Sequence, residues 1–554
     1  MIRFPFLTPF VLLFAATAAL AADPPRLIVV VSVDQLAYDY LPRFKKNYSP
    51  DGIFQRFWNE GANYVNAHHR HAYTYTAPGH AVQLTGCYSR SHGIVDNDWY
   101  ERETGKIINC VLDREVQIIG RPKNAKPPTA PDGVSPRNLR VETIGDRLRA
   151  KNKESKVFGV SFKDRAAVLM SGKNSSGAYW LDANTGHWVT STFYRQELPD
   201  YIQEINDAGV GKKYLEATWN LFHPAETYRL HRPDDSKYEG DYYSIGRAFP
   251  HYMQNPKKKD ELNLKRVGLS PFGNYVTLEM ATAVLKEEKL GLDEVPDMLC
   301  VNLSSNDYVG HNFGPFSLEV EDMCYWTDKQ LGDFARVIDQ QVGAKHWTLM
   351  LTADHGVAPI AEYARDLGLP GQRDPLGDLT KLKKELANLI AAQLGDAQSE
   401  KGYVLDCADN QTFLNWDEPM LAEPNGAKAR RLVADHMAKH PTVAVVATSD
   451  ELKAGKPEMI RFLPNLQKSF YPPRCGDVLL CFKPYKFHGT APATHGSPYE
   501  YDTHIPLMLW GAGIAPGEKT ADACPAQLCA TVGKLLGIDP PATCEEPALV
   551  EALK

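Results

Sequence analysis

Residues 27–34 read Leu-Ile-Val-Val-Val-Ser-Val-Asp, an apolar run that ends directly at an aspartate. Such a short run without a polar face is typical of a strand that is buried on both faces of a parallel sheet. Similar runs occur at residues 157–162, 298–303, 348–352 and 505–510, and helical periodicity lies at 138–151, at 381–394 and from Pro525 to Gly537. Strands that alternate with helices predict an α/β fold, in which helices flank a central, mostly parallel sheet on both faces.

Polar side chains follow four of these runs. Asp34 and Lys163 come directly after their strands, and Asp307 and Asp354 follow theirs within a few residues. In open α/β sheets, ligands bind beyond the carboxyl ends of the strands. We therefore expect these four side chains, which are far apart in the sequence, to converge at one edge of the sheet.

The rest of the chain is predicted to be organised around that sheet. Residues 1–22 combine Arg3, an apolar run and Ala19-Leu20-Ala21, which predicts a cleavable signal peptide and a periplasmic or secreted protein without a membrane span in the mature chain. Residues 23–554 are expected to form a single catalytic domain. Two segments, at about 176–290 and about 360–490, are expected to leave the sheet and return as caps over the active face.

Composition excludes several classes of protein. With 554 residues, of which 43% are hydrophobic and 10% aromatic, the chain is neither disordered nor collagen-like. It has 61 basic and 68 acidic residues and a formal net charge of −7, without a basic block, so a nucleic acid is not expected as a stable partner. An anionic substrate would therefore need a locally positive site.

Ten cysteines fit an oxidising compartment and allow up to five disulfides, but the sequence leaves their pairing open. The close pairs Cys475/Cys481 and Cys524/Cys529 are candidates for local bridges. No C-x-x-C is present, which argues against a thioredoxin-like or zinc-ribbon site.

Aspartates and histidines in the same regions form a candidate metal site. Asp307 and His311 lie one helical turn apart, so that both side chains can face one ion, and Asp354-His355 is an adjacent pair after a strand. Asp34 and His495, in Ala493-Thr494-His495-Gly496, complete a set of six ligands. Six nitrogen and oxygen donors without a thiolate suit two zinc-like ions.

A two-metal site of this kind needs a nucleophile, and Thr76-Ala77-Pro78-Gly79-His80 offers one. The threonine precedes a Pro-Gly turn and a segment, 80–85, that is expected to be helical. A hydroxyl group there would meet the positive end of the helix dipole, and a metal ion would lower its pKa. Taken alone, the same five residues would be read as an ordinary capping turn.

The six ligands, the nucleophile and their order along the chain resemble those of the alkaline phosphatase superfamily. The similar branch is the one shared by type I nucleotide pyrophosphatases/phosphodiesterases and phosphate-irrepressible alkaline phosphatases. The resemblance covers nearly the whole chain from Arg26 to Gly537. It implies an alkaline phosphatase-like fold, two zinc ions per chain and Thr76 as the nucleophile. It also implies two ligand sets: Asp34, Asp354 and His355 with Thr76 on one zinc, and Asp307, His311 and His495 on the other.

The phosphatase sub-branch carries a Lys-x-Arg that binds phosphoryl oxygens, matched here by Lys163 and Arg165, and an asparagine, matched by Asn97. A phosphate monoester is a dianion and gains more from two extra cations than a diester does. The expectation is therefore a broad-specificity zinc alkaline phosphatase that acts, as a monomer, on small phosphate monoesters through a covalent phosphothreonine. The alternatives are a nucleotide pyrophosphatase/phosphodiesterase and a non-catalytic, metal-containing binder of phosphorylated ligands.

Other histidines near these motifs are given structural roles. His80 could cap its own turn or lie behind the metal ligands, and the first role is expected. The cluster His68-His69-Arg70-His71 looks like a metal-binding tract, but we expect it to form loop and strand surface near the site. The sequence contains no G-x-S-x-G, Walker or H-E-x-x-H motif, and the segment 76–80 departs from the sulfatase pattern C/S-x-P-x-R.

Overall fold

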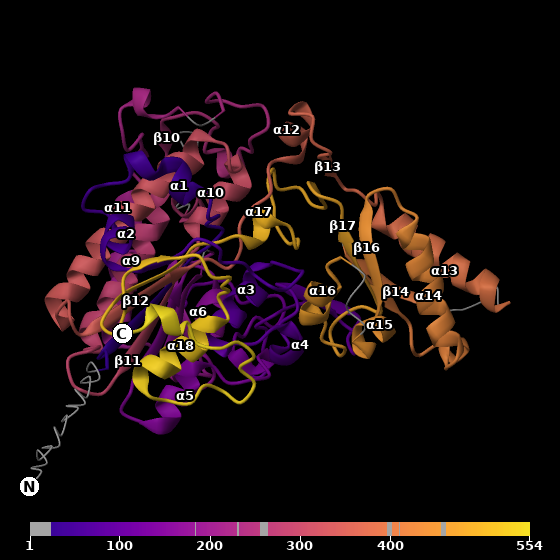
Figure 1. Ribbon diagram of the computed structural model, residues 1–554, viewed down its shortest axis with the longest axis horizontal. Coiled ribbons are helices and arrows are strands. Elements are labelled where there is room, and N and C mark those ends of the chain that lie inside the picture. Colours follow the sequence, from indigo (N-terminus) through magenta and orange to yellow (C-terminus); the bar gives the residue numbers. More distant parts are fainter. Residues whose placement is uncertain are drawn as a thin grey trace, which may run out of the picture.

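The structure is a computed structural model that describes residues 24–182, 184–229, 232–254, 264–395, 402–408, 410–455 and 461–554. The predicted signal peptide lies outside the described residues. Among the helices within those ranges, none has both the length and the apolar composition that crossing a membrane requires. Figure 1 shows a larger body that contains the central sheet, with a smaller lobe, coloured orange, beside it.

Ten strands of the described chain form the central sheet. Its middle is parallel, in the order β12 (Trp347–Thr352), β1 (Leu27–Val33), β11 (Asp297–Leu303), β6 (Val157–Ser161) and β7 (Gly177–Asp182). The strands β19 (Leu507–Gly511), β2 (Ala62–Tyr64) and β20 (Gly517–Lys519) continue it beyond β12, and β8 (His187–Ser191) and β5 (Ile118–Ile119) continue it beyond β7. The pairs at β12–β19, β19–β2, β7–β8 and β8–β5 are antiparallel. The predicted α/β fold with a mostly parallel sheet is confirmed.

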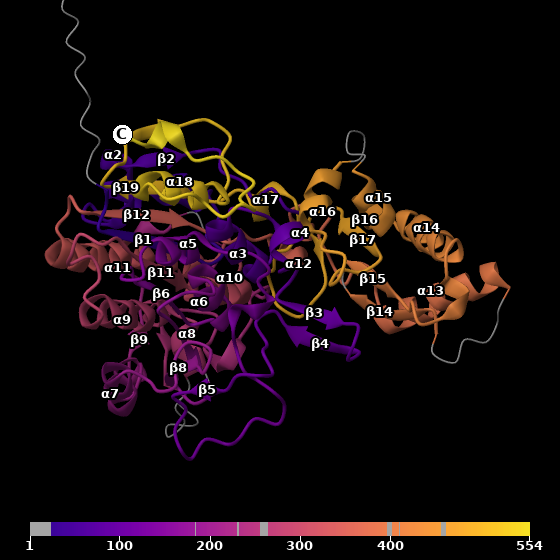
Figure 2. The ribbon, with the colours of Figure 1, turned by 90° about the horizontal axis from the view of Figure 1, so that it is seen from below.

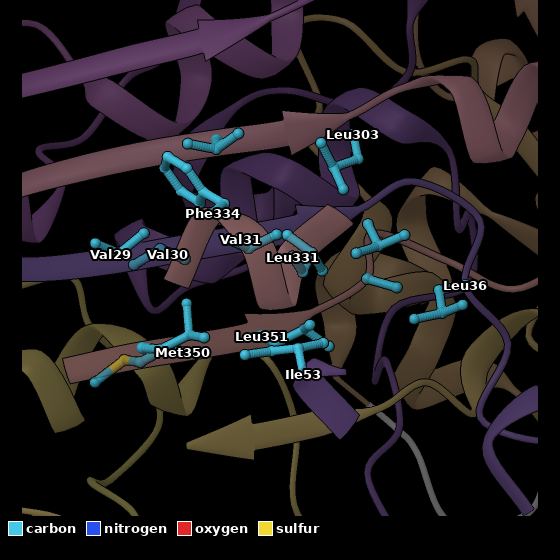
Figure 3. Packing of buried hydrophobic residues seen from close by; sticks show 14 of the residues in the cluster. Val29, Val30, Val31, Leu36, Ile53, Leu303, Leu331, Phe334, Met350 and Leu351 are labelled. Carbon is cyan, nitrogen blue, oxygen red and sulfur yellow. The ribbon is translucent and has the colours of Figure 1, made fainter. Parts of the chain in front are cut away.

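Helices cover both faces of this sheet, as Figures 1 and 2 show. One face carries α2 (Ile53–Glu60), α9 (Pro271–Glu287) and α11 (Leu318–Val342), and the other carries α3 (Thr76–Thr85), α5 (Ile144–Lys151), α6 (Asp164–Ser171) and α18 (Gln527–Leu536). Figure 3 shows Leu331 and Phe334 of α11 beside Val31 of β1, in a core where all these side chains are buried. The apolar strands are therefore shielded on both sides, and only their ends are available to a ligand.

The predicted helix at 138–151 is shorter in the structure. It begins at Ile144, because Thr143 accepts the Asp146 backbone N–H and the Asp146 side chain accepts the Thr143 backbone N–H, which forms a capping box. Residues Pro136–Asn138 form a separate 3-10 turn before it.

The segment 176–290 does not leave the sheet where it was expected to. It begins with β7 and β8, which extend the sheet, and it ends with α9 packed on the sheet. Its aromatic residues Tyr179 and Trp180 are buried strand residues instead of cap surface. Its described residues between α7 (Asp200–Ala208) and α9 form only short elements, among them β10 (His251–Tyr252) and α8 (Leu264–Gly268).

The segment 360–490 contains the smaller lobe of Figure 1, which we call the second lobe. An antiparallel sheet, in the order β14 (Val404–Ala408), β15 (Gln411–Leu414), β17 (Val478–Phe482) and β16 (Val443–Thr448), packs against α13 (Leu379–Leu394) and α14 (Asn425–Ala438) around its own apolar core. The hairpin of β3 (Asp98–Glu101) and β4 (Lys106–Asn109) lies next to this lobe in Figure 2. The hairpin contacts it through Arg102, which donates to the Leu414 carbonyl at 2.8 Å and to Asp477 at 2.7 Å.

All ten cysteines lie within the described ranges, and all are free thiols. The two close pairs, Cys475/Cys481 and Cys524/Cys529, are therefore not bridged in this structure.

Candidate metal centre and active site

The polar residues after the central strands meet at one point. Lys163 Nζ donates to Asp34 Oδ2 at 2.9 Å and to Asp307 Oδ2 at 2.6 Å. Gln35, next to Asp34, donates its backbone N–H to Asp354 Oδ1 at 3.1 Å. The carboxyl ends of β1, β6, β11 and β12 thus bring together the four side chains whose convergence the sequence predicts.

Two groups of buried side chains have ligand atoms within 4.8 Å of one another: Asp34, Asp354 and His355, and Asp307, His355 and His495. The first group contains the three protein ligands expected for one zinc ion besides Thr76. Next to the second group lies His311, on α10 (Ser305–Phe313), with its Nε2 3.1 Å from Asp307 Oδ1. The structure therefore gathers all six predicted ligands and places His355 between the two sets, where its ring stacks on His495 at 3.4 Å.

The three imidazoles of this cluster are oriented in the same way. Each Nδ1 lies within hydrogen-bond distance of a backbone carbonyl: His355 of Gly356 at 2.9 Å, His311 of Ala493 at 2.7 Å and His495 of Thr74 at 2.8 Å. A carbonyl can only accept, so each Nδ1 donates its proton to the carbonyl and each Nε2 is turned toward the carboxylates, where a metal ion would bind. Histidines that bind metals are held in this way.

Burial and the close approach of the charged groups shift the pKa values of this cluster. Burial and the neighbouring Asp354 carboxylate raise the pKa of Asp34 well above its ordinary value. Burial opposes ionisation of Asp307 as well, but His311 and Lys163 outweigh it and hold the Asp307 pKa well below the usual range. Burial lowers the pKa of His355, yet the Asp354 carboxylate overrides this and raises it to about 9.

Two carboxylate oxygens in the cluster, Asp34 Oδ1 and Asp354 Oδ2, are buried and accept no hydrogen bond of normal geometry from the residues that the structure describes. Both face His355 Nε2, at 3.6 Å and 3.2 Å. An unsatisfied buried carboxylate oxygen is costly unless a cation compensates it. The donor set of carboxylate oxygens and imidazole nitrogens therefore fits two zinc-like divalent ions.

Thr76 lies at the start of α3, which begins four residues earlier than the sequence predicted. Pro78 and Gly79 are part of its first turn, where a missing proline N–H removes no helical hydrogen bond. A Cβ atom on Gly79 would lie 2.2 Å from the Asp354 carbonyl oxygen, so glycine allows α3 to approach the end of β12 closely. Thr76 Oγ1 is thereby placed 3.4 Å from His355 Nε2.

The three predicted substrate-binding residues come from two parts of the chain, the loop before β3 and the start of α6. Asn97 Oδ1 accepts the Ala77 backbone N–H at 2.8 Å, which leaves its Nδ2 amino group as a donor for a ligand. Lys163 and Arg165 lie at the N-terminal end of α6. Burial disfavours the charge of Arg165, but Asp164 overcomes this and raises its pKa, and its buried Nε has no hydrogen-bond partner within the described ranges.

His80 binds its own turn, as expected, and it also lies beside a predicted metal ligand, with its Nδ1 3.3 Å from Asp354 Oδ2. Its Nδ1 donates to the Thr76 carbonyl at 2.8 Å, and its Nε2 accepts from Asn302 Nδ2 at 2.9 Å. The Asn302 side-chain oxygen in turn accepts from Ser161 Oγ at 2.8 Å, and that hydroxyl accepts the Lys163 backbone N–H at 2.9 Å. A buried hydrogen-bond network thus joins the turn of Thr76 to the strand end of Lys163.

Sequence reasoning missed two members of this assembly. Asn302 and Gln35 were not singled out, although Asn302 is a polar residue inside an otherwise apolar strand and could have been noticed for that reason. Gln35 has φ = 64°, and its Nε2 donates to Asp307 Oδ1 at 2.5 Å. A non-glycine residue in the left-handed region is strained, and such strain gathers at functional sites.

The histidine tract at 68–71 lies beside the site and outside both ligand groups. His69 Nε2 contacts the Ala353 carbonyl oxygen at 3.0 Å, and the ring of His68 stacks on His504 at 4.4 Å. The expectation that the tract lies near the site without holding a metal agrees with this placement, but the expected surface location is wrong for His69 and His71, which are both buried.

Comparison with known proteins gives a consistent result. The sequence profile described as type I phosphodiesterase/nucleotide pyrophosphatase matches residues 28–406. Alkaline phosphatase PafA of Elizabethkingia meningoseptica is 34% identical over 94% of this chain and 93% of its own length. Alkaline phosphatase PhoV of Synechococcus elongatus is 34% identical over 96% of this chain, and a calcium-transporting ATPase of Myroides odoratus is 33% identical over 95%.

The crystal structure of PafA superposes with a TM-score of 0.85 over 96% of this chain and the whole of that chain, at 33% identity. A second PafA structure, of a variant in which a threonine, an asparagine, a lysine and an arginine are replaced, superposes with a TM-score of 0.86. The agreement extends over both the central sheet and the second lobe, since the aligned portion is nearly complete.

Proposed function

Because the chain belongs to the type I phosphodiesterase/nucleotide pyrophosphatase family, we propose that it is a zinc-dependent alkaline phosphatase. It hydrolyses small-molecule phosphate monoesters with broad specificity, through a phosphothreonine on Thr76. One observation carries the proposal: Thr76 begins α3 within 3.4 Å of His355 Nε2, in a site that also presents the side chains of Lys163 and Arg165.

The PafA variant supports the choice of these residues. Its replaced threonine and asparagine are 21 residues apart, and its replaced lysine and arginine are two apart. Thr76 and Asn97 have the first spacing in this chain, and Lys163 and Arg165 have the second.

Two zinc ions would be held by the ligand sets described above, Asp34, Asp354 and His355 in one and Asp307, His311 and His495 in the other, with Thr76 beside the first. When bound, such ions lower the pKa of a hydroxyl group and stabilise charge on the attacking and leaving oxygens. Cations on Asp34 and Asp307 would also release the Lys163 ammonium group, which both carboxylates now hold.

The residues of the chain then have separate roles in the two steps of the reaction. Thr76 Oγ forms a bond to phosphorus while the bond from phosphorus to the ester oxygen breaks, and the positive end of the α3 dipole favours the negative charge there. Water attacks the phosphothreonine in a second step and releases phosphate. Asn97 Nδ2, Lys163 and Arg165 bind the non-bridging oxygens throughout.

Preference for monoesters follows from charge. A monoester dianion has three non-bridging oxygens for these donors, whereas a diester has one charge fewer and a second substituent. Each charged hydrogen bond contributes about 1.5–3 kcal/mol, so loss of both cations lowers the rate with monoesters by about 10²–10⁴-fold.

The test compares kcat/KM for a phosphate monoester and a phosphate diester that share one aryl leaving group, using zinc-loaded protein and an EDTA-treated control. We expect a large monoester preference that is lost in the Lys163→Ala/Arg165→Ala double variant. It should persist in Arg114→Ala, which removes an exposed arginine paired with Glu101. A diester preference would support the phosphodiesterase instead, and no metal-dependent turnover of either ester would support the non-catalytic binder.

We also propose that the protein is exported, with residues 1–22 removed, and acts as a monomer. The apolar N-terminal run and its small-residue pattern support export. N-terminal sequencing of the protein from the extracytoplasmic fraction, with its sedimentation velocity, tests both points. An uncleaved cytoplasmic chain or a stable dimer would contradict them.

A further inference from the structure

Three thiols gather at the C-terminal end of α3, the end opposite to Thr76. Cys87 lies just after this helix, Cys529 belongs to α18, which packs against α3, and Cys544 lies in the segment after α18. A Cβ atom on Gly86, which ends α3 with φ = 71°, would lie 2.4 Å from Cys544 Sγ and 3.2 Å from Cys529 Sγ. The glycine therefore leaves room for two sulfurs that lie close to the same point.

Within this group, Cys529 is the partner of Cys544. A hydrogen bond with the Cys529 thiol outweighs burial and nearby carboxylates and lowers the pKa of Cys544 to about 7. The Cys87 thiol is held instead by hydrogen bonds with the hydroxyl groups of Thr85 and Thr543. Cys544 is partly exposed, whereas Cys529 is buried. An accessible thiol with a lowered pKa beside a buried second thiol is the arrangement of an attacking and a resolving cysteine.

The segment that carries the accessible thiol is fixed against the end of α3 by the two residues that follow it. The Glu545 backbone N–H donates to the Gly86 carbonyl oxygen at 2.8 Å. The Glu546 side chain accepts from Arg70 Nη1 at 2.6 Å. Because these contacts hold the backbone next to the thiol, its sulfur stays beside α18.

We propose that Cys529 and Cys544 form a disulfide that fastens the C-terminal segment to α18. The oxidant is an external disulfide, such as oxidised glutathione. The Cys544 thiolate attacks one sulfur of the oxidant and releases the other, and Cys529 then attacks the Cys544 sulfur of this mixed disulfide and releases the second. The two protein thiols lose two electrons and two protons, and the oxidant is reduced to two thiols. This pairing competes with the local pair Cys524/Cys529 that the sequence suggests, and it is independent of the proposed phosphatase activity.

The test reduces the purified full chain, oxidises it with oxidised glutathione, alkylates the remaining thiols in denaturant and analyses the unreduced peptides by mass spectrometry. We expect one cross-linked peptide pair that joins Cys529 to Cys544, with all other cysteines alkylated. Cys544→Ser should abolish this pair. The matched control Cys524→Ser should keep it, because the Cys524 thiol contacts Tyr88 Oη, at 3.7 Å. A Cys524–Cys529 or Cys87–Cys544 bridge, a lasting glutathione adduct on Cys544, or ten alkylated cysteines would overturn the proposal.

Thermal unfolding measures what the cross-link does to the protein. Cys529 and Cys544 are 15 residues apart, and a disulfide that closes a loop of this length stabilises a protein mainly by restricting its unfolded chain. For a chain of this size, we expect the Tm of the oxidised protein to exceed that of the reduced protein by about 2–3 °C. The two treatments should give the same Tm in Cys544→Ser. Equal Tm values for the oxidised and reduced wild-type protein would contradict a fastening role of the disulfide.

Discussion

The carboxyl edge of the central sheet and the second lobe differ in what they contribute to the site. All predicted ligands except His495 follow strands of the central sheet, and so do Lys163 and Arg165. The second lobe has its own apolar core and supplies none of the predicted ligands. It borders the site through apolar packing shared with α3 and through contacts with the segment before α3, such as the hydrogen bond from Asn410 Nδ2 to Tyr75 Oη at 3.1 Å. The difference indicates that the ends of the parallel strands position the metal ligands and the substrate-binding cations, whereas the lobe packs against the segment that carries the nucleophile.

The largest expected loss of activity comes from a substitution at the carboxyl edge of the central sheet. Thr76→Ala removes the hydroxyl group that attacks phosphorus, and we expect kcat/KM for a phosphate monoester to fall by about 10⁴-fold or more. The matched control is Thr85→Ala, at the other end of the same helix, where the hydroxyl donates to the Ala81 carbonyl at 2.6 Å. Steady-state kinetics of both variants checks this, and a Thr76→Ala protein with near wild-type turnover would refute the assignment.

A smaller effect is expected one step away from the reacting atoms. Asn302→Leu breaks the link between His80 and Ser161 and leaves buried polar groups unpaired, at a cost of about 1–3 kcal/mol each in the free energy of unfolding. Because the turn of Thr76 then loses its support, we expect kcat to fall about tenfold with a smaller change in KM. Denaturant unfolding and steady-state kinetics measure the two quantities, and a stability loss without any change in kcat would make Asn302 purely structural.

The smallest effect on catalysis is expected from the second lobe. Leu386 is fully buried in α13, so Leu386→Ala should cost about 2–5 kcal/mol of unfolding free energy. We expect kcat/KM at a temperature where the lobe stays folded to remain within about twofold, because no ligand comes from this lobe. Leu84→Ala, equally buried but in the nucleophile's helix, should lower both quantities. Equal kinetic losses in the two variants would break the distinction between the regions.

The same comparison explains what the sequence could predict. Strands buried on both faces appear as apolar runs, and the polar residue after each run marks the edge where ligands gather. Asp34, Lys163, Asp307 and Asp354 were found by that rule alone. The aromatic strands β7 and β8 were not predicted by that rule. Tyr179 and Trp180 resemble cap surface until the pairing of β7 with β6 and with β8 is known.

Other features of the site can be recognised only in the three-dimensional structure. The position of His355 between the two ligand sets depends on how its ring is turned by the Gly356 carbonyl, which no spacing reveals. The left-handed conformation of Gln35 is likewise invisible in a sequence without a glycine at that position. The sheet of the second lobe is formed by strands separated by long segments, so its pairing could not be predicted from local pattern.

The most direct test of the account is to trap the covalent intermediate. Zinc-loaded protein is mixed with a phosphate monoester, quenched in acid within one turnover and digested, and the peptides are examined by mass spectrometry. The account predicts one phosphoryl group on Thr76, absent from the EDTA-treated protein and from Thr76→Ala. Release of phosphate at the wild-type rate with no phosphoryl group on Thr76, under conditions where a phosphothreonine standard survives, would contradict it.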